Sequence, residues 1–277
     1  MSPFSTRGKT GSSWVDIFVK RLNPKFDLES FFSQLQIAAQ SALLLDYDGT
    51  LAPFQLQRDQ AFPYPGVREM LSRLLHGGRT RIVIVSGRAI KDLIPILNLN
   101  KLPEIWGAHG MERLTAEGSY ELTALPKEVV ATLEAASAWA EEVGLAGNAE
   151  SKPGCLAFHW RGLPDIKARE IHDLVKETWS GKNGLRLIPF DGGVELRATA
   201  KNKGDAVATV LSEMHDDGVA AYLGDDQTDE DAFNAIKGRG AAVLVNPEVR
   251  QTAADLQIVP PGELLEFLQR WAAATGA

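Results

Sequence analysis

Short apolar runs alternate with longer stretches of helical periodicity along most of the chain. Four mostly apolar runs lie at residues 41–45, 81–85, 219–223 and 241–245, and segments with helical spacing lie at 66–76, 90–97 and 204–214. Apolar strands that alternate with helices are typical of a parallel sheet covered on both faces. We therefore expect an α/β fold with a Rossmann-like parallel-sheet core, whose functional groups lie beyond the carboxyl ends of the strands.

The middle of the chain, residues 113–196, has a different pattern. A strand, a helix, a second strand, a second helix and two further strands are predicted there, at 119–122, 127–143, 154–161, 164–179, 185–189 and 193–197. This order predicts a small α+β module inserted into a core made of residues 41–112 and 197–277. The N-terminal segment 1–40 is expected to hold a Ser/Gly/Thr-rich tail to about residue 13, then one or two helices between Trp14 and Gln40.

Composition and charge narrow the class of function. The chain has 277 residues, of which 44% are hydrophobic and 23% charged, as in ordinary globular proteins. Its formal net charge of −7 argues against a nucleic-acid partner, which requires a basic face. The same charge repels a phosphorylated substrate at long range, so a phosphate site has to rely on a few local cations.

Cysteine content and hydropathy bear on the compartment. The single cysteine, Cys155, excludes an internal disulfide, fits a reducing compartment and is expected to be a small buried residue rather than a nucleophile. No apolar run approaches the ~20 residues needed to span a bilayer, and the N-terminus lacks the apolar region of a signal peptide. We expect a cytoplasmic protein without a membrane partner, and a monomer.

The strongest chemical signal is Asp46-Tyr47-Asp48-Gly49-Thr50, directly after an apolar run. A carboxylate at a strand end can attack phosphorus and form an acyl phosphate that water then hydrolyses. A second acid two residues further on can protonate the leaving oxygen and later activate the water. The competing interpretation is an acidic loop with a turn glycine, which is common in α/β proteins.

A second signal is the run of acids at 225–231, again after an apolar run. Asp225, Asp226 and Asp229 would repel one another strongly unless a cation lies among them. Hard oxygen ligands beside a phosphate substrate indicate Mg²⁺, which needs only one or two protein carboxylates. The competing interpretation is a helix N-terminus that attracts acids, and this accounts for Glu230 and Asp231.

Two weaker signals point to phosphate binding. Ser86-Gly87-Arg88 follows a predicted strand, where a hydroxyl and backbone N–H groups can hold phosphate oxygens. Lys203 opens a predicted helix, where it can neutralise charge on a phosphoryl group in transfer. Each alone has an ordinary explanation, a strand-to-helix turn or a surface lysine.

In this order the four motifs resemble those of the haloacid dehalogenase-like phosphatase superfamily. The resemblance implies that Asp46 is the nucleophile, that Asp48 is the general acid and base, and that Ser86, Gly87 and Lys203 hold the phosphoryl group. It further implies that Asp225 binds Mg²⁺ together with Asp46 and the backbone carbonyl of Asp48. Asp226 and Asp229 would then organise the surroundings of the metal, and the inserted module 113–196 would be a cap domain over the site.

A narrower resemblance, from Ala42 onward, is to the trehalose-6-phosphate phosphatase family. It is carried by the four motifs and by Gly107-Ala108-His109-Gly110, Glu150-Ser151-Lys152, His159-Trp160-Arg161 and Glu195-Leu196-Arg197. It implies a sugar phosphate substrate, with Glu150, Lys152 and Glu195 on the unphosphorylated glucose ring. Arg88, His109 and Arg161 are further candidates for substrate contact, and the roles of His109 and Arg161 stay open.

Three functions therefore compete. The first is hydrolysis of trehalose 6-phosphate, and the second is hydrolysis of another sugar phosphate, such as sucrose phosphate or glucosyl-3-phosphoglycerate. Trp160 and Ala198 depart from the usual Tyr and Pro of the family, and both lie in or beside the predicted cap, where substrate identity is decided. The third is a non-catalytic regulatory module, which is expected to lose an acid or the lysine, whereas this chain retains them all.

Overall fold

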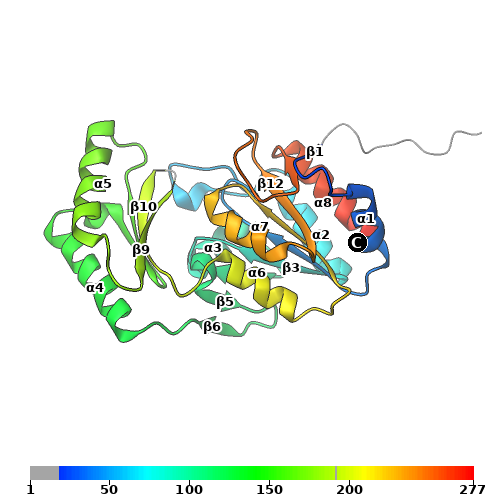
Figure 1. The fold of residues 1–277 in the computed structure, drawn as a ribbon, viewed down its shortest axis with the longest axis horizontal. Helices are drawn as coiled ribbons and strands as arrows, with labels where there is room; N and C mark the ends of the chain where they lie inside the picture. Colours follow the sequence, from blue (N-terminus) through cyan, green and yellow to red (C-terminus); the bar gives the residue numbers. More distant parts are fainter. Residues whose placement is uncertain (1–18, 191) are drawn as a thin grey trace, which may run out of the picture.

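Two β-sheets with separate hydrophobic cores make up the described part of the chain, residues 19–190 and 192–277 of a computed structural model (Figure 1). The larger sheet has nine strands and the smaller has four. Since the candidate catalytic residues follow strands of the larger sheet, its topology decides where they meet.

Six strands of the large sheet are parallel. In spatial order they are β13 (Leu256–Ile258), β12 (Gly240–Val245), β11 (Val219–Gly224), β2 (Ser41–Leu45), β3 (Thr80–Val85) and β4 (Glu104–Gly107). Antiparallel strands extend both edges, namely β1 (Lys20–Arg21) beside β13, then β5 (Glu112–Leu114) beside β4 and β6 (Tyr120–Leu122) beside β5. The α/β fold that the apolar runs predict is confirmed.

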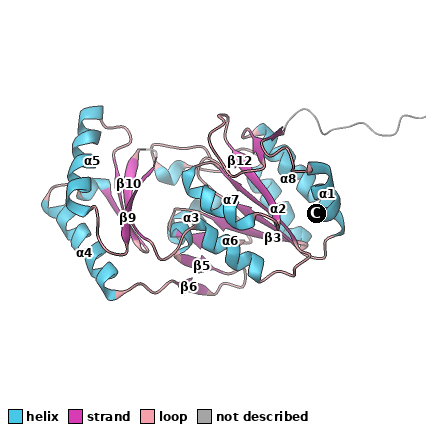
Figure 2. Ribbon diagram, in the orientation of Figure 1, coloured by secondary structure: helices cyan, strands magenta, loops and turns pink. Residues whose placement is uncertain are grey.

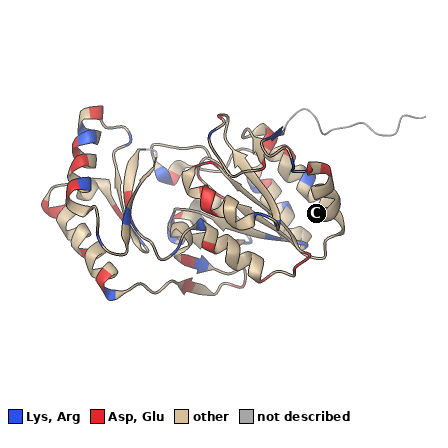
Figure 3. Cartoon of the chain, in the orientation of Figure 1, with Lys and Arg blue, Asp and Glu red and all other residues tan. Residues whose placement is uncertain are grey.

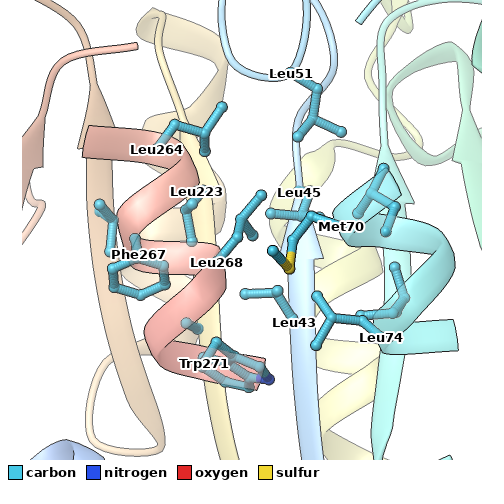
Figure 4. Close-up of a cluster of buried hydrophobic side chains, with 14 of the residues drawn as sticks. Leu43, Leu45, Leu51, Met70, Leu74, Leu223, Leu264, Phe267, Leu268 and Trp271 are labelled. Atoms are coloured by element: carbon cyan, nitrogen blue, oxygen red, sulfur yellow. The ribbon is translucent and has the colours of Figure 1, made fainter. Parts of the chain in front are cut away.

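Helices cover both faces of this sheet because its central strands are apolar on both sides. Along β2, Leu43 and Leu45 belong to one hydrophobic cluster, and Ala42 and Leu44 belong to another. The first cluster includes residues of α1 (Leu28–Ile37), α2 (Val67–Gly77), α3 (Ile90–Leu97) and α8 (Gly262–Thr275), and Figure 4 shows side chains of α2 and α8 packed around Leu43 and Leu45. The second cluster is closed by α6 (Lys203–Ser212) and α7 (Glu230–Ile236).

The N-terminal segment contains one helix of the one or two predicted for 14–40. Among residues 19–40 this is α1, which begins where the Asp27 side chain accepts hydrogen bonds from two backbone N–H groups of the first turn. Residues 20–21 form β1 instead. The predicted tail, and the part of the predicted helix at 14–18, lie outside the described residues.

The four-stranded sheet is antiparallel throughout and holds helices on one side only. It contains β7 (Ala149–Lys152), β8 (Cys155–His159), β10 (Gly193–Ala198) and β9 (Leu185–Phe190), in that order. In Figure 2, α4 (Lys127–Glu142) and α5 (Asp165–Trp179) cover the side that faces away from the large sheet. Leu156, Phe158 and Leu196 pack with these helices, which leaves the alternate residues of the strands on the side toward the large sheet.

One predicted strand belongs to the other sheet. The strand expected at 119–122 forms β6, which pairs with β5 at the edge of the large sheet and not with the inserted strands. β7 was not predicted, because Glu150, Ser151 and Lys152 are polar and lack the apolar alternation of a half-buried strand. The four-stranded sheet therefore begins later along the chain than its predicted start at residue 113.

Charged residues avoid the centre of the large sheet. Figure 3 shows them mainly on helices and loops, and the central strands carry almost none. Within the described residues, no helix is both long and apolar enough to cross a membrane.

Candidate active site

The carboxyl ends of the parallel strands bring the four sequence motifs together. Asp46 follows β2, Ser86 follows β3 and Asp225 follows β11, which are neighbours in the sheet. Lys203 is the first residue of α6, whose cap Asn202 accepts a hydrogen bond from the backbone N–H of Asp205. Residues from four separate parts of the chain thus meet at one edge.

Lys203 lies between two buried carboxylates. Its Nζ donates to Asp46 Oδ1 at 2.8 Å and to Asp229 Oδ1 at 2.7 Å, and all three side chains are almost fully buried. Burial lowers the pKa of Lys203, but Asp229 and Asp46 outweigh it and hold the pKa well above its usual value. Burial raises the pKa of Asp46 to about 8, in spite of the opposing effect of Lys203.

Asp229 is saturated with hydrogen bonds. Its Oδ1 accepts from Lys203 and from the Tyr222 hydroxyl at 2.6 Å, and its Oδ2 accepts from the backbone N–H groups of Asp225 and Asp226 at 3.0 Å each. These bonds fix the loop after β11. Asp226 in turn accepts from the backbone N–H and the hydroxyl of Thr228, both at 2.7 Å.

Asp46, Asp225 and Asp229 offer oxygen atoms that lie within 4.8 Å of one another. Burial and the neighbouring Asp46 raise the pKa of Asp225 well above its usual value. When all three acids are ionised, their charge exceeds that of Lys203 by two, which equals the charge of one divalent cation, and the raised pKa values show that the acids are costly to ionise without such a cation. The residues present therefore fit a hard cation held by oxygen ligands.

Gly49 allows Asp225 to approach the loop after β2. Gly49 has φ +79°, and a Cβ atom at this position would lie 2.1 Å from Asp225 Oδ2. In the structure the space that a side chain would take is occupied by the Asp225 carboxylate.

Asp48 is held by Arg88. The Nε and NH2 atoms of Arg88 donate to the two oxygens of the Asp48 carboxylate at 2.7 Å each, and NH1 donates to the backbone carbonyl of Arg58 at 2.8 Å. Burial lowers the pKa of Arg88, and Asp48 more than compensates, so that the pKa is raised. The side chain of Asp48 is thus paired with an arginine and lies outside the cluster of Asp46, Asp225 and Asp229.

The loop after β3 is clamped to the turn after β4. Ala108 and His109 both have left-handed backbone angles, with φ +47° and +57°, and their N–H groups donate to the carbonyls of Arg88 and Ser86. The His109 ring packs against Gly87, where a Cβ would lie 2.6 Å from ring atoms. Ser86 is buried, and its Oγ accepts from the Arg88 backbone N–H at 3.1 Å.

Glu195 and Lys152 reach this loop from the four-stranded sheet. Glu195 pairs with Lys152 and with His109, whose Nε2 lies 3.0 Å from Glu195 Oε2. Lys152 Nζ also donates to the Gly87 carbonyl at 3.1 Å. Burial raises the pKa of Glu195, but Lys152 and His109 outweigh it and hold the pKa well below its usual value. Burial lowers the pKa of His109 to about 4, so the ring is neutral near pH 7.

Glu150 lies beside Glu195 on the same face of the sheet, because both are paired with Ala157 of β8. Glu150 contacts Arg58, and its Oε2 lies 3.0 Å from His159 Nε2. Arg161 follows β8, donates to the Gln55 carbonyl at 3.2 Å and lies over the Phe54 ring.

A cavity of about 700 Å³ connects the catalytic edge with the four-stranded sheet. Polar residues from both ends line it, together with six apolar or aromatic residues from the loop after β2, from α3 and from β9: Phe54, Phe62, Pro95, Ile96, Ile188 and Phe190. Two predicted site residues, Ser86 and Asp229, do not line this cavity, but each contacts a residue that does, Arg88 and Lys203 respectively. The others all line it: Asp46, Asp48, Gly87, Arg88, His109, Glu150, Lys152, Arg161, Glu195, Lys203, Asp225 and Asp226.

A model of the trehalose-phosphatase family matches residues 44–255, which contain all of these groups. The chain belongs to this family. It is 29% identical to trehalose-phosphate phosphatase B of Arabidopsis thaliana, over 94% of this chain and 72% of the relative. The chain is accordingly a phosphatase, a phosphoric monoester hydrolase.

Two solved structures from Candida albicans share the fold of this family member. The C-terminal domain of a trehalose-6-phosphate phosphatase superposes with a TM-score of 0.74 at 21% identity, covering 92% of this chain and 99% of that one. The C-terminal domain of a trehalose synthase regulatory protein superposes with 0.66 at 15% identity, covering 88% and 98%. Since a regulatory protein has the same fold, the fold alone leaves the function open.

Sequence patterns missed three residues that shape the site. Tyr222 lies inside an apolar run, where the pattern predicts a core residue, yet its hydroxyl donates to Asp229. Arg250 lies far from every motif, yet it binds the carbonyl of Asp226 at 2.5 Å and the carboxylate of Glu230. Arg58 has no motif around it. Only the folded contacts reveal these roles.

Proposed function

We propose that the protein hydrolyses trehalose 6-phosphate to trehalose and phosphate, with Mg²⁺, through an aspartyl phosphate on Asp46. One observation carries the proposal. A buried carboxylate in contact with Lys203 lies at one end of a cavity, and acidic and basic groups suited to sugar hydroxyls lie at the other end. The names of the relatives supply the choice of sugar.

In the first step Asp46 attacks phosphorus. A bond forms between an Asp46 oxygen and phosphorus, and the bond from phosphorus to the sugar oxygen breaks. Asp48 gives its proton to that departing oxygen. In the second step Asp48 takes a proton from water, which attacks the same phosphorus and releases phosphate and the free Asp46 carboxylate.

The pairing of Asp48 with Arg88 has a consequence for the first step. Asp48 has to carry the proton that it gives to the sugar oxygen, whereas Arg88 donates to both of its carboxyl oxygens in the structure. We expect the bound substrate to accept a hydrogen bond from Arg88 in place of one Asp48 oxygen. That oxygen is then available to carry a proton. Lys203 and the backbone around Gly87 would hold the phosphoryl oxygens, with Ser86 fixing the loop through Arg88.

Asp46, Asp225 and the backbone carbonyl of Asp48 would hold Mg²⁺. The cation, when bound, stabilises negative charge on the transferring phosphoryl group. Asp229 and Asp226 would not be ligands, because their oxygens hold the loop after β11. That loop in turn places the Asp225 carboxylate.

The four-stranded sheet with α4 and α5 would act as a cap that binds the unphosphorylated glucose ring through Glu150, Lys152 and Glu195. All three side chains are paired with protein groups in the structure. Sugar hydroxyls would share or replace these contacts. A sugar of the wrong shape would leave them unpaired in a partly buried site, which is a strong basis for discrimination.

The test is phosphate release from a panel of sugar phosphates, with Mg²⁺ and with excess chelator. We expect turnover of trehalose 6-phosphate above sucrose phosphate, glucosyl-3-phosphoglycerate and glucose 6-phosphate, and loss of turnover in chelator. Asp46→Asn should abolish activity because the amide cannot form the acyl phosphate. Preference for another sugar phosphate would overturn the substrate, and an inactive wild-type protein would favour a regulatory role.

A further inference from the structure

Arg58 lines the cavity between its catalytic end and its sugar end, and the mechanism proposed above gives it no role. It begins η1 (Arg58–Gln60), a single turn in the loop between β2 and α2. Its side chain is 46% exposed and lines the cavity. Its partners lie about a hundred residues away along the chain, in the four-stranded sheet.

The position of Arg58 is fixed from both sides. Its backbone carbonyl accepts from Arg88 NH1 at 2.8 Å, and the same guanidinium holds both oxygens of Asp48. Its NH1 contacts the Glu150 carboxylate and lies 3.0 Å from His159 Nε2. A continuous chain of contacts therefore runs from the catalytic acid to the sugar end of the cavity, and it passes through one residue.

Arg58 still has hydrogen-bonding capacity. The contacts of its side chain with other described residues use NH1, whereas an arginine has five N–H donors, of which three lie on Nε and NH2. Glu150 likewise uses Oε2 for both Arg58 and His159, and its Oε1 remains an acceptor. Both partners can bind a ligand without separating.

At the sugar end of the cavity, Arg58 lies beside acidic side chains. When they are ionised, Glu150 and Glu195 can accept hydrogen bonds but cannot donate them. Lys152 already donates to Glu195 and to the Gly87 carbonyl. Burial lowers the pKa of His159 to about 4, an effect that the Arg58 cation increases, so the ring near pH 7 is neutral and offers a single N–H. A sugar hydroxyl both donates and accepts, and a site that recognises it needs a donor beside its acids.

We propose that Arg58 is a specificity-determining residue, whose guanidinium donates to hydroxyl oxygens of the sugar ring that carries no phosphate, beside Glu150. The inference rests on the proposed function. Because Arg58 is anchored next to Asp48, it sets the distance between the phosphate and the hydroxyl that it binds. A phosphorylated sugar with a second ring at that distance is favoured over a monosaccharide phosphate.

The test compares Arg58→Ala and Arg58→Lys with the wild type on trehalose 6-phosphate, glucose 6-phosphate and p-nitrophenyl phosphate. The readout is the kcat/KM for the disaccharide phosphate divided by that for p-nitrophenyl phosphate. One hydrogen bond to a charged group changes binding by roughly 10–100-fold, so Arg58→Ala should lower this ratio by that factor. Arg58→Lys should retain part of it, because lysine keeps the charge but lacks the planar fork.

A second readout separates binding from folding. Trehalose should inhibit p-nitrophenyl phosphate turnover, and its inhibition constant should rise roughly 10–100-fold in Arg58→Ala. Gln60→Ala, in the same turn and exposed, is the matched control and should change neither readout more than about twofold.

The outcomes distinguish this inference from the proposed function. The role of Arg58 is overturned if the ratio in Arg58→Ala stays within about twofold of the wild-type ratio. It is also overturned if kcat/KM falls equally on all substrates. If the wild type prefers another two-ring sugar phosphate, the proposed substrate fails and the ratio is measured with that compound instead. If it prefers no sugar phosphate over p-nitrophenyl phosphate, both fail.

Discussion

Replacing Gly49 with alanine probes how the loop after β2 fits against Asp225. An alanine at φ +79° adopts a left-handed conformation, which costs about 1–2 kcal/mol. Its Cβ would lie 2.1 Å from Asp225 Oδ2 and 2.4 Å from Cγ, so the carboxylate would have to withdraw by more than 1 Å to reach ordinary contact at 3.4 Å. Overpacking of this kind costs a further ~1–3 kcal/mol.

Gly118→Ala is the matched control. Gly118 has φ +91° and nothing within 4 Å of an added Cβ, so its replacement carries the conformational cost alone. Urea denaturation without Mg²⁺ should therefore show Gly49→Ala to be less stable than Gly118→Ala by about 1–3 kcal/mol. Phosphate release should fall roughly 100-fold in Gly49→Ala only, because an ångström of misplacement at a catalytic group has that effect. Equal stability and equal activity in the two variants would refute the argument that Gly49 makes room for Asp225.

Three further predictions follow from contacts of the site and the sheet. Lys203→Met should lower the free energy of unfolding by about 3–5 kcal/mol in urea, because Asp46 and Asp229 lose their buried partner; an unchanged midpoint would contradict this. Alanine at Glu150, Lys152 or Glu195 should reduce kcat/KM for trehalose 6-phosphate by roughly 10–10³-fold, or about 1.4–4 kcal/mol, and p-nitrophenyl phosphate turnover much less; equal losses would assign these residues to the framework. Burial raises the pKa of Glu213, but hydrogen bonds from Arg113 and Arg81 hold it below the usual 4.5. Its contribution to stability is thus present at pH 7 and lost as the pH falls through the lowered pKa, so wild type and Glu213→Gln should differ in denaturation at pH 7 and converge once the pH is below that lowered pKa.

The parallel core was predictable because each strand is a short aliphatic run that ends at a polar residue. Such runs have no stable place except between two layers of helices. The topology then brings the residues after β2, β3 and β11 to one edge, so the meeting of Asp46, Ser86 and Asp225 follows from local pattern alone. The roles of these residues remain predictions.

The rest depends on contacts between distant segments. The strand at 119–122 has a clear local pattern, but nothing in that pattern says which sheet it joins. The contact of Arg58 with Glu150 joins residues 92 positions apart, and a half-exposed arginine in a loop has no periodicity. The partners of Arg88 and Lys152 were missed for the same reason, since a charge in the sequence does not indicate which opposite charge it will meet.

The four-stranded sheet keeps its own hydrophobic cluster on the face turned away from the cavity. Substitutions at the cavity-facing positions of β7, β8 and β10 therefore open no void in that cluster, although Lys152 and Glu195 among these positions also contact the loops of the catalytic edge. Over evolutionary time such an arrangement allows preference for one sugar to drift toward another while the hydrolytic machinery is retained. Ile188, which lines the cavity and is paired with Glu195, is the position from which we would begin to redesign the protein for a shorter or bulkier sugar phosphate.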